Sequence, residues 1–429
     1  MTSLAIALRT RTFRSLRRHR NYRIFFTGQV VSLAGTWMQN IALAWFVVEL
    51  TDSPLAVGGL AFCRFLPFML FGLYAGVIAD RFDNRKLVMV TQAAQMVVSV
   101  ALTALAFSGW ENVPIVYALA FLGGTALVVD APGRQALTFQ MVGRDELPNA
   151  IALNTGLFNG SRIIGPAIAG VIIGLGGTGI CFLVNAITFL AVLTALALMR
   201  EDELFKVVRD PRTRAGTAIA EGIRYAWGNG DIRLALTVLA IASTVGFNFH
   251  VIIPVLASDT LNAGPEVFGI LSAFFGGGAL LGALIQAARS RASWIGLLLG
   301  ATGFSAGLLA LAPVKTVAPA CAILFFVGIC FTLWVSNTSA ILQLRAPDRL
   351  RGRVMSLFMF AFAGLAPIGG LFAGWLMEVG GTQLALSLGG SMSLVVIGYA
   401  WIKHTGVDLR RRPSVPLFTA EAEEASRAA

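Results

Sequence analysis

The stretch GVIADRFDNRKLVMV, residues 76–90, places five charged side chains between two apolar segments. Asp80 stands at the end of the first segment, and Arg81 and Arg85 follow it. An acid beside the start of the next helix is stabilised by about 0.3–1 kcal/mol at exposed sites. It can also pair with a cation of another helix and release it. We therefore interpret Asp80 as an inner latch between helices. For Arg81 and Arg85, the interpretation from topology is that they hold the loop in the cytoplasm.

Two further arginines fall inside apolar segments, Arg64 in FCRFLP and Arg162 in GSRIIG. Each is expected near the middle of the bilayer, roughly 15–20 Å along its helix. A membrane-buried arginine costs at least ~2.5 kcal/mol unless it faces water or a partner. We predict that Arg64 and Arg162 face a central cavity and suit an anionic substrate group, such as a carboxylate or catecholate. The alternative is a structural bond to backbone carbonyls or polar neighbours.

Asp130 and Arg134 are four residues apart with the acid first, which is the favourable order for an ion pair within one helix. The simplest interpretation is a pair that neutralises itself. We also predict that Asp130 belongs to the inner network of Arg81 and Arg85. As the most deeply placed acid, Asp130 is a candidate proton carrier. Glu49, at the outer end of the first apolar segment, is a competing candidate, unless it is only a solvated rim residue.

Polar side chains form a stripe along the first apolar segment. They recur mostly three or four residues apart, a spacing that places them on one face of a helix. This pattern is typical of a cavity wall, and we predict that Gln39 and Asn40 face the substrate. The stripe comprises Gln29, Ser32, Thr36, Gln39 and Asn40.

The elements that position these side chains must lie in lipid. Of the 429 residues, 56% are hydrophobic and 13% are charged, whereas a soluble domain has about 25% charged residues. The apolar runs reach the ~20 residues that a membrane helix needs, and they do not alternate as barrel strands do. The sequence therefore predicts an all-α membrane protein with twelve transmembrane helices.

The net charge of +11 invites a nucleic-acid interpretation, but its distribution favours membrane topology. Nearly all of the 33 Lys and Arg residues fall on one side of the predicted helices, and Lys315 is the one basic residue assigned to the opposite loops. This bias places both termini in the cytoplasm. The basic excess also suits contact with anionic lipid headgroups, and we expect no nucleic-acid partner.

The polar interval 201–231 divides the chain into two halves that resemble each other. GPAIAGVIIGLGGT in the first half aligns with PIGGLFAGWLMEVGGT in the second, so that Gly170 falls on Gly374. Repeated membrane halves are typical of transporters that move one half against the other. We predict a basic cytoplasmic segment, two pseudo-symmetric six-helix bundles, a cytoplasmic linker with an amphipathic helix over about 215–227, and a disordered cytoplasmic tail. The basic segment spans 1–23, the two bundles span 24–200 and 232–403, the linker spans 201–231, and the tail spans 404–429.

The motif GVIADRFDNRK resembles the loop motif GxLaDrxGrk of the major facilitator superfamily. Gly76, Asp80, Arg81 and Arg85 match it, together with Ala79 and Lys86, whereas Asp83 stands where Gly is usual. Residues of about 20–405 resemble the branch that contains the enterobactin exporter and the macrolide efflux pumps. The resemblance implies the major facilitator fold, a small-molecule exporter that exchanges its substrate for protons, and an inner gate formed by this motif.

The fifth predicted span, GLFNGSRIIGPAIAGVIIG, resembles the family's exchanger motif GxxxGPxxGG. Small residues allow close helix packing, and Pro removes a helical hydrogen bond and bends the segment. The resemblance favours export over import, and close packing alone is the alternative. The motif residues are Gly160, Ser161, Gly165, Pro166 and Gly170.

Two motifs that enzymes use, HExxH and a Walker loop, do not occur in the sequence. The four Cys and three His residues show no metal-ligand spacing. We therefore predict a monomeric secondary transporter of the bacterial cytoplasmic membrane, without cofactor or metal. It would export a small amphiphilic molecule (a siderophore, macrolide or other drug) by proton antiport. The alternatives are an importer or lysolipid flippase of the same fold and, from another class, a membrane-embedded enzyme.

Overall fold

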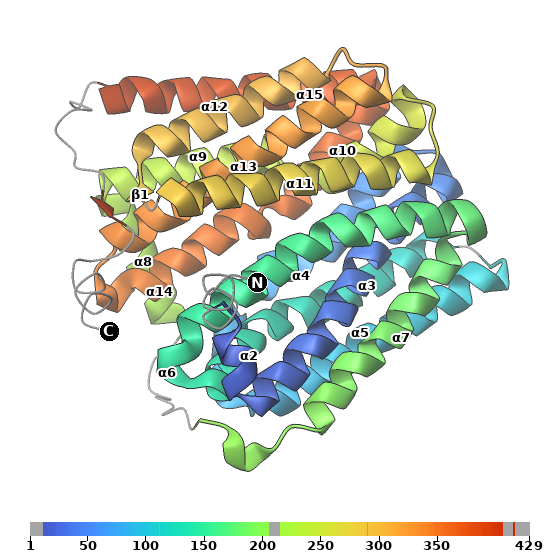
Figure 1. Ribbon diagram of the computed structural model, residues 1–429. Helices are drawn as coiled ribbons and strands as arrows, with labels where there is room; N and C mark the ends of the chain where they lie inside the picture. Colours follow the sequence, from blue (N-terminus) through green and yellow to red (C-terminus); the bar gives the residue numbers. More distant parts are fainter. Residues whose placement is uncertain (1–11, 111, 206–214, 290, 406–414, 417–429) are drawn as a thin grey trace, which may run out of the picture. The chain divides into compact units, whose positions relative to one another are not determined.

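A computed structural model describes residues 12–110, 112–205, 215–289, 291–405 and 415–416 (Figure 1). The described chain is almost entirely helical. The predicted disordered tail, 404–429, lies outside the described residues, apart from 404–405 and 415–416. Val415 and Pro416 pair with Ala292 and Arg291 in a short antiparallel bridge. The elements are α2 Arg14–Arg18, α3 Arg20–Thr51, α4 Pro54–Arg81, α5 Asn84–Ser108, α6 Val113–Gly176, α7 Thr178–Ala197, η1 Glu201–Glu203, α8 Ala215–Gly228, α9 Gly230–Gly246, α10 Phe249–Val255, η2 Leu256–Thr260, α11 Pro265–Arg289, β1 Arg291–Ala292, α12 Trp294–Leu311, α13 Val317–Arg345, α14 Asp348–Met359, η3 Phe360–Gly364, α15 Ala366–Thr405 and β2 Val415–Pro416.

Ten helical stretches of the described chain are long and apolar enough to cross a membrane. Two of them are too long for one passage: α6 has 64 residues, and the stretch Leu350–Lys403 has 54, whereas about 20 residues suffice for one passage. Each contains a backbone break, at Gly143 in α6 and at Gly380 and Gly381 in α15. The twelve predicted spans are therefore present, four of them joined in pairs, and the predicted all-α fold is confirmed.

Local sequence explains where several helices begin. The helix α5 begins after Asp83, whose carboxylate accepts from the Lys86 backbone N–H at 2.9 Å. Asn229 caps α9, and Ser293 caps α12. Such caps satisfy backbone donors that a helix start leaves free. The acid at position 83, where the family motif usually has Gly, thus has a structural role.

The described contacts group the chain into two compact units. Unit 1 comprises Met1–Asp52, Cys63–Thr213 and Gly264–Ile270, and unit 2 comprises Ser53–Phe62, Arg214–Ala263 and Leu271–Ala429. The units follow the two halves of the sequence, except that the first turns of α4 belong to unit 2 and those of α11 to unit 1. The helix over Ala215–Gly228, in the interval predicted to be amphipathic, packs on α14 and α9 within unit 2.

Close backbone packing at glycines explains why the first turns of α4 belong to unit 2 and those of α11 to unit 1. Within unit 2, a Cβ on Gly374 would lie 2.8 Å from the Pro54 carbonyl oxygen and 3.0 Å from the Gly58 Cα. Within unit 1, a Cβ on Gly170 would lie 2.9 Å from the Pro265 carbonyl oxygen. Both crossings bring two helix backbones together at a position that only a residue without a side chain can occupy. The repeat seen in the sequence therefore has a counterpart in packing.

The break at Gly143 generates a stability prediction. Gly143 has φ +70° and ψ −176°, a conformation that costs other L-residues roughly 1–3 kcal/mol, and a Cβ there would also meet the Phe205 ring at 3.0 Å. We expect Gly143→Ala to lower the thermal unfolding temperature of the purified protein in detergent. Gly156→Ala, in the same helix with open space around its Cβ, should leave that temperature unchanged or raise it. Equal effects of the two substitutions would contradict this account of the break.

Candidate functional site

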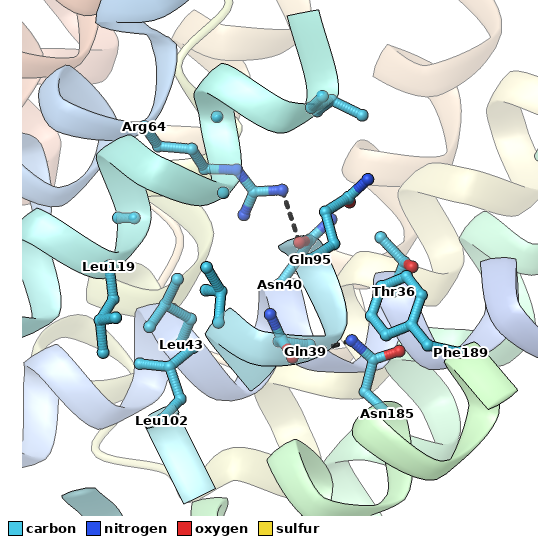
Figure 2. A pocket seen from close by; sticks show the side chains of 15 residues that line it. Thr36, Gln39, Asn40, Leu43, Arg64, Gln95, Leu102, Leu119, Asn185 and Phe189 are labelled. Carbon is cyan, nitrogen blue, oxygen red and sulfur yellow. Dashed lines mark hydrogen bonds between the residues drawn. The ribbon is translucent and has the colours of Figure 1, made fainter. Parts of the chain in front are cut away.

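A polar pocket lies within unit 1, among the helices α3 to α7 (Figure 2). The first of these helices contributes Thr36, Gln39 and Asn40, the second Arg64 and the third Gln95. The pocket is partly open and has a volume of about 40 Å³, which is room for a few water molecules. It can therefore hold one polar group of a ligand rather than a whole siderophore. The fifteen lining residues also include Leu43, Val98, Leu102, Leu119, Ala120, Gly123, Gly124, Leu127, Asn185 and Phe189.

Arg64 is the one charged residue among these fifteen. Its Nη2 donates to the Asn40 Oδ1 at 2.5 Å, and its guanidinium lies 5.8 Å from the centre of the Phe65 ring. Its backbone is fixed because Gly124 of α6 packs directly on the Arg64 carbonyl, where a Cβ would overlap the oxygen. The structure thus brings Arg64, Gln39 and Asn40 of the predicted cavity to one pocket, with a neutral amide as the hydrogen-bond partner of the cation.

Gln39 has a second role at the base of the pocket. Its Oε1 accepts from the Ser99 hydroxyl at 2.6 Å and from the Asn185 Nδ2 at 2.8 Å. Ser99 and Asn185 are fully buried. These bonds tie α3 to α5 and α7, so that the Gln39 carbonyl oxygen is engaged in structure.

Gln95 is a pocket residue that the sequence analysis missed. Its Nε2 is buried, and no acceptor lies within hydrogen-bond distance among the described residues. Figure 2 shows Gln95 on the same side of the pocket as Arg64 and Asn40. Both Arg64 and Gln95 therefore offer donors, which fits an oxygen-rich group of a ligand. Gln92, Gln95 and Ser99 recur at helical spacing along α5, and this stripe could have been found.

Arg162, the second predicted cavity cation, does not line this pocket. Its guanidinium lies 5.7 Å from the centre of the Trp37 ring, and Trp37 also meets Phe158 edge to face at 5.5 Å. A ring face stabilises a cation by about 0.5–2 kcal/mol. Arg162 thus lies beside the stripe of α3, on a face of that helix that is distinct from the pocket wall.

The predicted pair of Asp130 and Arg134 forms the centre of a buried network. Asp130 is 1% exposed. Its Oδ1 accepts from the Thr91 hydroxyl at 2.7 Å and from the Gln92 Nε2 at 2.9 Å. Its Oδ2 accepts from the Arg134 Nε at 2.9 Å and also from Nη2. The Arg134 Nη1 donates to the Gln29 Oε1. Helices α3, α5 and α6 thus meet at one compensated charge pair.

The loop motif has a structural role within unit 1. Arg85 donates to the Leu196 carbonyl at 2.8 Å and to the Ala197 carbonyl at 3.1 Å, and it pairs with Glu201. These carbonyls end α7, where a cation is favoured. Arg81 is exposed. The side chain of Asp80 and the surroundings of Gly76 lie outside the described residues, so the gate latch stays a prediction.

The remaining predicted residues lie along α6 and near the C-terminal end of α3. Ser161 and Pro166 are buried, whereas a Cβ on Gly160 would meet open space. A Cβ on Gly165 would lie 2.5 Å from the Trp37 Cβ, so close helix packing explains Gly165, as it does Gly170. Glu49 accepts from the Trp45 Nε1 at 2.8 Å. Pro166 lies inside the helix, so the bend expected there stays a prediction, and the break in backbone geometry within α6 is at Gly143.

Comparisons with known proteins agree with the described fold. Residues 10–414 match the model of a family described as transmembrane secretion effector. A staphyloferrin A transporter of Staphylococcus aureus is 28% identical, with 87% of this chain and 94% of that protein covered. The multidrug efflux pump Tap of Mycolicibacterium fortuitum is 30% identical, with 83% and 89% covered. The fold is similar to that of a POT family transporter crystallised with 5-aminolevulinic acid, at a TM-score of 0.71 and 12% identity, with 90% and 96% covered.

The Asp130 network generates a double-mutant prediction. Arg134→Gln leaves a buried carboxylate without its cation, and breaking a buried pair from one side costs about 3–5 kcal/mol. Combining Arg134→Gln with Asp130→Asn removes both charges and should recover most of this loss. We expect the single variant to unfold at a clearly lower temperature in detergent than the double variant. The Asp130→Asn single variant completes the comparison. If the unfolding temperature of the double variant falls by the sum of the decreases in the two single variants, the pair does not act as a unit.

Proposed function

Because the chain belongs to the transmembrane secretion effector family of the major facilitator superfamily, we propose that it exports a small amphiphilic acid from the cytoplasm in exchange for protons. The chain is a multi-pass membrane transporter and not an enzyme. The direction, the acidic character of the substrate and the coupling ion are parts of the proposal. A multidrug efflux pump among its relatives supports export. With a siderophore transporter and a macrolide efflux protein, it leaves siderophores, macrolides and other drugs as candidate substrates.

The observation that carries the proposal is the environment of Arg64. A membrane arginine is costly unless it meets a partner or water, and no acid occurs among the fifteen residues that line its pocket. Asn40 accepts one hydrogen bond from Arg64, which leaves other guanidinium donors for a ligand. The Gln95 Nε2 adds a neutral donor. A carboxylate, catecholate or similar oxyanion would satisfy both groups.

Alternating access of the two halves is the mechanism that we propose for transport. Related halves around a substrate site are suited to it, and the paired glycine crossings allow backbones to approach without large side chains. We place the protein in the bacterial cytoplasmic membrane as a monomer with both termini inside. An importer or a lysolipid flippase of the same fold is the alternative, and uptake of substrate into right-side-out vesicles would favour it.

Arg64 can be tested by transport into inverted membrane vesicles with an imposed proton gradient. We expect Arg64→Gln to raise the KM for acidic substrates about tenfold or more, because a charge-assisted hydrogen bond contributes about 1.5–3 kcal/mol. Lys315→Gln, which removes an exposed charge in a loop, should leave the KM unchanged. Membrane insertion of both variants is measured in parallel. An unchanged KM in a correctly inserted Arg64→Gln protein would refute the acid-binding role.

Proton coupling can be assigned with two matched acid-to-amide substitutions. We expect Asp130→Asn, made together with Arg134→Gln so that neither charge is left unpaired, to retain downhill transport but to lose acceleration by an imposed pH gradient, because the buried carboxylate is then absent from unit 1. Glu49→Gln should respond to the gradient as the wild type does. The reverse result would move the carrier role to Glu49, and a gradient response in both variants would contradict both candidates.

A further inference from the structure

Helix α8 has a covered face and an exposed face within unit 2. Its covered face packs on α14 and α9, where Gly222 and Ala226 are buried. A Cβ on Gly222 would lie 3.0 Å from the Arg353 Cβ of α14. Ile223 and Trp227, which lie four residues apart and therefore share a face, are 45% and 68% exposed. A face turned to water is normally polar, so this apolar face indicates a different environment.

The position of α8 along the chain places it at a boundary of the membrane. Helix α9 begins at Gly230, two residues after α8 ends, and it opens a stretch that is apolar enough to span the membrane. Helix α8 itself has 14 residues, fewer than the ~20 that one passage needs, and it includes Glu221 and Arg224. A short helix with one apolar face, next to a span, lies in the plane of the interface with that face towards the acyl chains.

The acids of α8 and of the start of α9 are engaged in ion pairs inside unit 2. Glu221 pairs with Arg353 of α14, and the Asp231 carboxylate lies 3.4 Å from the Arg345 guanidinium of α13. The Tyr225 hydroxyl also donates to the Arg345 carbonyl at 3.3 Å. These contacts hold α8 in place and neutralise its negative charge, so that neither acid opposes an anion on the exposed face.

Two exposed arginines stand on either side of Trp227 in the sequence. Arg224 precedes it by one helical turn and is exposed. Arg233 is exposed as well, and its Nη1 donates to the Trp227 carbonyl at 3.0 Å, which holds the cation at the end of α8. Neither arginine forms an ion pair with an acid among the described residues. We call Ile223, Arg224, Trp227 and Arg233 the α8 surface.

We infer that the α8 surface binds an anionic phospholipid of the adjacent membrane leaflet. The lipid phosphate accepts from Arg224 and Arg233, because guanidinium donors bind phosphate through charge-assisted hydrogen bonds. The acyl chains lie along Ile223 and Trp227, since the amphipathic ring of tryptophan favours the level of the headgroups. The inference does not depend on the transported substrate, and all of its residues lie in unit 2. Each arginine beside an anionic headgroup is expected to contribute about fivefold in affinity.

Native mass spectrometry tests the α8 surface with the full-length protein in detergent, because it resolves individual bound lipids. The protein is titrated in turn with phosphatidylglycerol and with phosphatidylcholine of the same acyl chains. We expect the wild type to bind its first phosphatidylglycerol at least about tenfold more tightly than phosphatidylcholine, a preference that falls at high salt. Arg224→Gln combined with Arg233→Gln should bring the two affinities within about twofold of each other. Arg224→Gln alone leaves the bond of Arg233 to α8 intact and should still lower the preference about fivefold.

Arg17→Gln combined with Arg23→Gln is the matched control, because it removes the same charge from exposed side chains of unit 1. This control should keep the preference, and unfolding temperatures in detergent are measured in parallel to show that both double variants are folded. Equal affinities of the wild type for the two lipids, or an equal loss of preference in both double variants, would overturn the α8 surface as the lipid site. Glycerophosphate carries the same phosphate without acyl chains and should not compete. Competition at the concentration of the lipid would assign the surface to a soluble phosphate and overturn the lipid partner.

Discussion

The cost of a charge in hydrocarbon governs the arrangement of the N-terminal half of this protein. Asp130 and Arg134 meet this cost by pairing and by recruiting Thr91 and Gln92 as further donors. Arg162 lies over the face of Trp37. Arg64 differs, because the partner recorded for its guanidinium is a neutral amide. An ion pair whose charges cancel stabilises the contact between helices. A cation whose partners are all neutral can still form a charge-assisted hydrogen bond with an anionic ligand.

Close backbone approach is the second constraint, and it places the charged side chains. Gly124 allows α6 to contact the Arg64 carbonyl, so that the arginine projects from a fixed backbone. Gly328 does the same for Phe275. Any side chain at either glycine would overlap that carbonyl and separate the helices. The two halves therefore share their backbone contacts, although the side chains around those contacts differ in chemistry.

Much of this arrangement could be predicted from the sequence because its signals are local. Twelve apolar segments and the i,i+4 pair of Asp130 and Arg134 depend on spacing alone. The helical stripe of α3 also located Gln39 and Asn40, which line one pocket with Arg64. Contacts between segments were not predictable: Gln39 bonds to Ser99 and Asn185, and Arg85 bonds to the end of α7. The continuation of helix on both sides of Gly143, a single glycine with positive φ, was not predictable from spacing either.

The choice of Asn40 rather than an acid as the partner of Arg64 is consistent with a site that must both bind and release. A carboxylate at that position would form a charge-assisted pair roughly twice as strong as a neutral hydrogen bond, and an acidic substrate would have to displace it. Without any partner, the empty site would leave a bare cation in the membrane. An amide acceptor lies between these limits: it stabilises Arg64 in the structure, and the proposed function requires that it yield to an oxyanion of the substrate. Under that proposal, favourable yet reversible binding in each transport cycle would follow from this intermediate strength.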